Sequence, residues 1–137
     1  MSGAIGALAI AAAGAWLAAA VVGLSATRRA GLVAAGAVSG LGGAAAAVCG
    51  VLLAVHGAGG PTITLGAGPA GGASFHVAPL AAPFIALLGL VAGAIALYAP
   101  RYHEPEAGTA VYLPVYNLAL MASLAVLIAG HGITDAR

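Results

Sequence analysis

The chain has 137 residues, of which 63% are hydrophobic and 5% are charged, and none is a lysine. A soluble domain of this length needs about a quarter of its residues charged to keep its surface wet, so this composition excludes a soluble globule. The net charge of +1 argues against a nucleic-acid partner, which would require clustered Lys and Arg. We therefore expect one all-α integral membrane domain over residues 1–137, in contact with the lipid bilayer.

The first two apolar segments, residues 4–24 and 30–56, are each long enough to cross a bilayer, which takes ~20 residues. A polar break with Arg28 and Arg29 separates them. A cleaved signal peptide carries its basic residues before a shorter apolar stretch, whereas here the basic pair follows a long one. The pattern therefore predicts two retained transmembrane helices. Cys49, the single cysteine, excludes an internal disulfide and behaves as a small hydrophobe.

Residues 57–79 differ in composition, because they contain three prolines and many glycines. This content excludes a continuous helix. Two short β-like runs, at 62–65 and 73–77, flank a turn-rich stretch. They predict a small β-hairpin-like loop between the second and third spans, lying on the membrane surface.

Two further spans are predicted at 80–99 and 111–130. Pro83 falls in the first turn of the third span, where its missing N–H costs little. Pro114 is expected in the opening turns of the fourth span. Pro100 is expected to end the third span, because the residue before a proline avoids helical angles.

The connection between the third and fourth spans gathers Arg101, Glu104, Glu106 and the tyrosines Tyr98 and Tyr102. Tyrosines at such positions are typical of the aromatic belt at headgroup level. These side chains specify no catalytic mechanism on their own. We interpret the stretch as a short solvated loop.

The arginines also predict the orientation of the chain. Arg28, Arg29 and Arg101 lie in the two short loops, whereas residues 57–79 carry no Arg or Lys. By the positive-inside rule the short loops face the cytoplasm, and both termini and the long loop face outward. The predicted location is the inner (cytoplasmic) membrane, as a multi-pass protein.

Two small-xxx-small pairs mark candidate packing faces. Gly36 and Gly40 lie in the second span, and Gly89 and Gly93 in the third. A spacing of four places each pair on one helix face, where another backbone can approach closely. We expect these faces to meet neighbouring helices, including another membrane subunit.

No Asp, Glu or Lys lies inside the predicted spans, and His56 stands only at the end of the second span, although ionisable groups inside spans usually mark ion pathways. No two histidines show the i, i+4 spacing of a helical metal site. We predict no catalytic, cofactor-binding or metal-binding residue. Asn117 is the one strongly polar residue near the start of a span, and we favour an interhelical hydrogen-bond donor over a transport residue. The four histidines are interpreted as residues at helix ends or in loops: His56, His76, His103 and His131.

The order of these features resembles the N-terminal region of the antiporter-like membrane subunits of respiratory complex I (NADH-quinone oxidoreductase) and energy-converting hydrogenases. The large membrane subunit of hydrogenase-4 and formate hydrogenlyase complexes looks nearest, and Mrp-type antiporters belong to the same superfamily. Three motifs carry the resemblance: VAPLA at 77–81, YAPRY at 98–102 and NLALMAS at 117–123. The chain departs from the family pattern at three points. Ala78 stands where Asp is usual, and Arg101 stands where Gly is usual. The pair Ala129-Gly130 stands where the family has an alanine followed by an aspartate.

The resemblance implies a membrane subunit, or the N-terminal part of one, in a proton-translocating oxidoreductase of the hydrogenase or complex I type. Such families continue for roughly ten more helices, which hold the glutamate and lysines implicated in proton movement. The implied partners are other membrane subunits of a respiratory or hydrogenase complex. The chain would be a non-catalytic helical scaffold beside the ion-translocating core. The alternative is a self-contained four-helix protein that forms a homo-oligomeric carrier.

Overall fold

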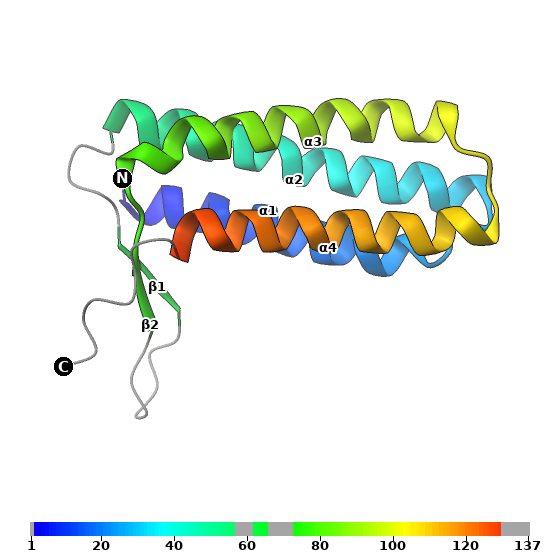
Figure 1. The fold of residues 1–137 in the computed structure, drawn as a ribbon, viewed down its shortest axis with the longest axis horizontal. Helices are drawn as coiled ribbons and strands as arrows, with labels where there is room; N and C mark the ends of the chain where they lie inside the picture. Colours follow the sequence, from blue (N-terminus) through cyan, green and yellow to red (C-terminus); the bar gives the residue numbers. More distant parts are fainter. Residues whose placement is uncertain (1, 57–61, 66–72, 130–137) are drawn as a thin grey trace.

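The computed structural model describes residues 2–56, 62–65 and 73–129 of the chain (Figure 1). Within them lie four long α-helices, each long and apolar enough to cross a membrane, which indicates a multi-pass membrane protein. The chain therefore resides in a lipid bilayer. The helices are α1 (Ser2–Gly23), α2 (Arg29–His56), α3 (Ala82–Tyr102) and α4 (Ala107–Ala129).

Two short strands lie between α2 and α3. β1 (Thr62–Leu65) and β2 (Ala73–His76) pair antiparallel, with Thr62 opposite His76 and Leu65 opposite Ala73. The turn of the predicted hairpin, residues 66–72, lies outside the described residues. A single 3-10 turn, η1 (Pro79–Ala81), then leads directly into α3.

The four helices run side by side, with the two strands at one end (Figure 1). α2 packs most extensively against α3 and also against α1, while α4 packs mainly on α1. α3 and α4 are consecutive along the chain but barely contact each other. The arrangement is therefore a bundle with one open side, between α3 and α4.

The core consists of two clusters of buried apolar side chains. The larger cluster draws on all four helices and centres on Trp16, which is fully buried. A smaller cluster fills the end where α1 turns into α2, and consists of Ala26, Leu32, Ala35 and Leu113. Large apolar side chains elsewhere point outward, as expected for helices surrounded by lipid rather than water.

The predicted end of α3 at Pro100 is wrong, because the helix continues to Tyr102. Proline lacks the N–H that would bond the carbonyl of Ala96, but this loss falls in the last turn, where little helix remains to be disturbed. The amide of His103 still bonds the carbonyl of Ala99 at 3.0 Å. Arg101 consequently lies in the last helical turn and not in the connecting loop.

The expected position of Pro114 is also wrong, because α4 begins at Ala107 and Pro114 lies about two turns inside it. The early start is held by the link from α3, where Thr109 Oγ1 donates to the carbonyl of Glu104 at 2.8 Å. The proline ring packs on Gly23 of α1, where an added β-carbon would lie 3.1 Å from the ring Cδ. Close packing against α1 thus accommodates a proline in the interior of α4.

Candidate functional site

Among the described helices, α2 and α3 make the closest contact. A β-carbon added to Gly43 would lie 2.7 Å from the amide nitrogen of Gly93 and 2.8 Å from the carbonyl oxygen of Gly89. One added to Gly50 would lie 2.8 Å from the carbonyl oxygen of Ala82. Real β-carbons essentially never approach other atoms this closely, so the two backbones meet only because these positions are glycine.

The four glycines predicted to mark packing faces differ in their surroundings. Gly89 faces the backbone of Ala47 in α2, and Gly36 faces Pro100 of α3, with an added β-carbon 3.0 Å from its Cγ. Gly40 is less tightly packed, and an added β-carbon on Gly93 would meet nothing within 4 Å. The structure therefore places Gly36 and Gly89 at the internal α2–α3 contact and leaves Gly93 open on its outer side.

Sequence reasoning missed Gly43 and Gly50, although a signal was present. Gly36, Gly43 and Gly50 recur every seven residues, which keeps small residues on one side of a helix that coils slightly around its partner. On α3 the same spacing relates three buried small residues: Ala82, Gly89 and Ala96. A search for a spacing of seven, beside the spacing of four, would have found this contact.

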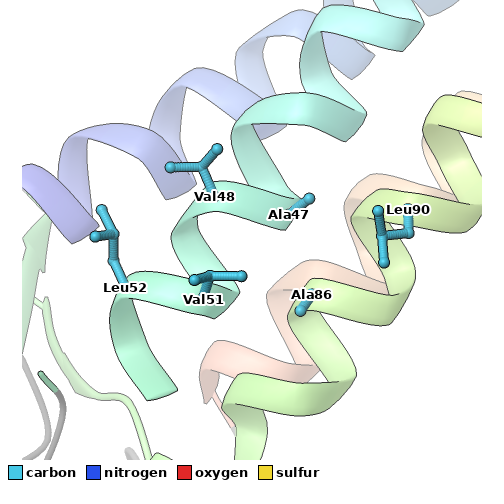
Figure 2. Close-up of a pocket in the computed structure, with 6 residues that line it drawn as sticks. All are labelled: Ala47, Val48, Val51, Leu52, Ala86 and Leu90. Carbon is cyan, nitrogen blue, oxygen red and sulfur yellow. The ribbon is translucent and has the colours of Figure 1, made fainter. Parts of the chain in front are cut away.

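An apolar groove runs along the outer side of this contact. It has a volume of about 700 Å³ and extends from Val33 and Pro100 at one end to Ala47 and Leu90 at the other. A smaller groove of about 230 Å³ shares Ala47 and Leu90 and continues the same line. Figure 2 shows this continuation, where side chains of α2 lie opposite Ala86 and Leu90 of α3.

A second apolar opening separates α3 from α4 and has a volume of about 620 Å³. It lies in the half of the bundle away from the α3–α4 link. Only Ser123 adds a hydroxyl to it, and that hydroxyl donates to the carbonyl of Ala119 at 2.8 Å. We refer to this opening as the α3–α4 cleft; its lining residues are Phe84, Leu87, Leu88, Val91, Ala122, Ser123, Val126 and Leu127.

The three arginines that determined the predicted orientation lie at the same end of the bundle. Arg28 and Arg29 stand where α1 passes into α2, and Arg101 stands in the last turn of α3, which runs antiparallel to α2; all three are exposed. Tyr98, Tyr102 and Tyr112 also lie at this end, which we call the arginine end, and Tyr116 lies one turn further into α4. Their rings form two neighbouring pairs: Tyr98 with Tyr102 at 6.0 Å, and Tyr112 with Tyr116 at 6.1 Å.

Buried polar side chains lie between the two core clusters. Asn117 is buried, but its Nδ2 donates to the carbonyl of Leu113 in the same helix at 2.9 Å. The prediction that Asn117 donates to another helix is therefore wrong. The carbonyl one turn earlier in its own helix accepts the hydrogen bond instead. Two described side chains donate between α1 and α2 instead: Trp16 Nε1 to the carbonyl of Ser39 at 3.2 Å, and Cys49 Sγ to the carbonyl of Ile5 at 3.5 Å. The Oγ of Ser39 and the Oδ1 of Asn117 are buried without a hydrogen-bond partner.

The two histidines whose side chains the structure describes, His56 and His103, lie at opposite ends of the bundle. His56 ends α2, and His103 follows α3 with its ring 5.2 Å from that of Tyr112 at the opposite end. His131 lies outside the described residues, and only the strand backbone of His76 is described. Among the described residues no three His, Cys, Asp or Glu side chains group in a way that could hold a metal ion.

In comparisons with known proteins, no family model, no curated sequence and no solved structure matches the chain.

Proposed function

We propose that the chain is a non-catalytic scaffold subunit, or the N-terminal part of one, in a proton-translocating oxidoreductase of the hydrogenase-4 or NADH-quinone oxidoreductase type. The reaction class rests on the resemblance of the motifs at 77–81, 98–102 and 117–123 to antiporter-like membrane subunits. The scaffold role rests on the architecture. The described helices carry arginine only near their ends and hold no carboxylate or lysine in their interiors.

The observation that carries the scaffold role is the α3–α4 cleft. α3 and α4 are consecutive along the chain but hardly touch. The opening between them has a volume of about 620 Å³ and is lined almost entirely by apolar side chains. Helices in lipid associate through close packing rather than through the hydrophobic effect. An apolar opening of this size is suited to a helix from a neighbouring subunit, which would contact both α3 and α4.

The proposed location is the inner (cytoplasmic) membrane, with the arginine end in the cytoplasm and the paired strands β1 and β2 forming an outer hairpin. The three arginines at one end of the bundle support this orientation. In this arrangement the ion-conducting carboxylates and lysines, as well as the redox centres, would belong to partner subunits.

The test is purification of the tagged chain from its native membranes in mild detergent. We expect subunits that carry redox cofactors to copurify, together with hydrogen- or NADH-dependent electron transfer in the eluate. Ala122→Trp would fill the cleft and should reduce this copurification at least several-fold. Ala18→Trp is the matched control, because Ala18 is an exposed alanine outside the cleft and the grooves.

The same cleft would also fit a second copy of this chain, as in a self-contained homo-oligomeric carrier. Elution of the chain alone, at a mass that is a multiple of its own, would support that alternative. Equal copurification of redox subunits with both tryptophan variants would show that the cleft is not the contact.

A further inference from the structure

The outer groove between α2 and α3 has the shape of a channel for one hydrocarbon chain. Its floor is formed by small residues, including Gly40 and Gly93, and its rim by large exposed side chains such as Leu41 and Leu97. The step of fourteen residues from Val33 to Ala47 corresponds to a length of about 21 Å. The groove is thus long and lined by apolar side chains alone.

Two cations stand at one mouth of this groove. Arg101 directly follows Pro100, the last lining residue of α3, and Arg29 lies one turn before Val33, the first lining residue of α2. Both arginines are exposed. The two carboxylates at this end belong to the link between α3 and α4, whereas the groove is lined by α2 and α3 alone.

The depth of the arginines matches that of a lipid headgroup. Tyr98 and Tyr102 lie on α3 beside Arg101 and are both exposed, as residues of an interfacial belt are. Gly93 lies eight residues from Arg101, about 12 Å along the helix. One leaflet of the hydrocarbon core is about 15 Å deep, so a chain from a lipid in the same leaflet reaches Gly93.

We propose that this groove binds an anionic phospholipid, with one acyl chain over Gly40 and Gly93 and the phosphate group between Arg29 and Arg101. Charge complementarity favours this occupant. The two guanidinium groups at the mouth attract a lipid with net negative charge, and they stabilise a bound zwitterionic lipid less. The floor favours the acyl chain, because the groove is lined only by Val, Gly, Ala, Leu and Pro and offers no polar side chain to a polar ligand.

The experiment is native mass spectrometry of the purified full-length protein from bilayers of phosphatidylglycerol and phosphatidylcholine in equal amounts. We expect preferential retention of one phosphatidylglycerol. Arg29→Gln and Arg101→Gln should each weaken this retention about fivefold. Gly93→Leu should reduce retention of both lipids, because leucine would enter the groove; Ala18→Leu, on an exposed site of α1, is its matched control and should bind as the parent does.

The fluorescence of Trp16, the single tryptophan of the chain, verifies that each variant retains its fold. Equal retention of both lipids by the parent would overturn the charge selection, and unchanged binding by Gly93→Leu would overturn the placement of the acyl chain. Displacement of the lipid by inorganic phosphate alone would identify a phosphate site and overturn the lipid assignment.

Discussion

At the scale of single residues, glycine decides which parts of α2 can touch a neighbour. Gly42 and Gly43 are adjacent but face different helices. A β-carbon on Gly42 would lie 2.7 Å from Nε1 of Trp16 in α1, and one on Gly43 would meet the backbone of α3. Because successive residues on a helix point about 100° apart, two consecutive glycines let α2 approach both of its neighbours.

Gly89 and Gly93 provide a matched pair for testing this packing. Gly89→Ala places a methyl group against the backbone of Ala47, and we expect it to lower the free energy of unfolding by about 1–3 kcal/mol. Gly93→Ala points into open space and should be neutral or stabilising by up to ~1 kcal/mol, since alanine favours the helix. Unfolding in mixed detergent micelles, followed by Trp16 fluorescence, measures both. Equal losses would mean that α2 and α3 do not meet at Gly89.

At the scale of whole elements, the start of α4 depends on contacts with the link that precedes it. Thr109 lies in the first turn of α4, is buried, and bonds the carbonyl of Glu104 across the link. This contact and the bond from the amide of Ala110 to the carbonyl of Glu106 at 3.1 Å begin α4 four residues before the expected position.

Replacement of Thr109 should therefore loosen the start of α4. Thr109→Val keeps the shape but leaves the Glu104 carbonyl without its partner, and should lower the free energy of unfolding by about 1 kcal/mol. Thr109→Ser should restore most of the loss. Thr27→Val, in the exposed α1–α2 link, is the control and should have no measurable effect. Thermal unfolding in one detergent compares the three variants, and a stable Thr109→Val would assign the helix start to packing alone.

The existence of the four helices could be predicted from sequence because hydropathy over ~20 residues reports transfer into lipid directly. Their ends could not, because proline rules describe an isolated helix. Pro100 is tolerated in a last turn, and Pro114 is held by contact with Gly23 of another helix. The search for glycines four residues apart identified Gly36 and Gly89. Which glycines face the backbone of the other helix, however, depends on the register of α2 against α3. That register is a property of the folded pair.

At the scale of the whole molecule, the arginine end sets a clear expectation for orientation. Thr27 lies at this end, and Leu80 lies beside the start of α3 at the opposite end. In a Cys49→Ala background, a cysteine at position 27 should react with a membrane-impermeant maleimide only after the cells are opened. A cysteine at position 80 should react from outside. The reverse labelling pattern would invert the orientation.

The bundle alone should conduct no protons, because its described helices hold no carboxylate or lysine in their interiors. Liposomes containing the purified chain should acidify, under an imposed pH gradient, no faster than empty liposomes, as reported by an enclosed pH-sensitive dye. A faster flux that disappears when one histidine is replaced would contradict this expectation and identify that histidine as a conducting group.

The packing of α4 on α1 has a consequence for biosynthesis. α4 is synthesised more than eighty residues after α1, so the side of α1 that receives α4 lacks this neighbour while those residues are being made. Ala9, Ala13 and Leu17 lie on this side. We expect α1, α2 and α3 to form an incomplete bundle during that interval, so that the docking of α4 is a step at which an insertase or a partner subunit can act.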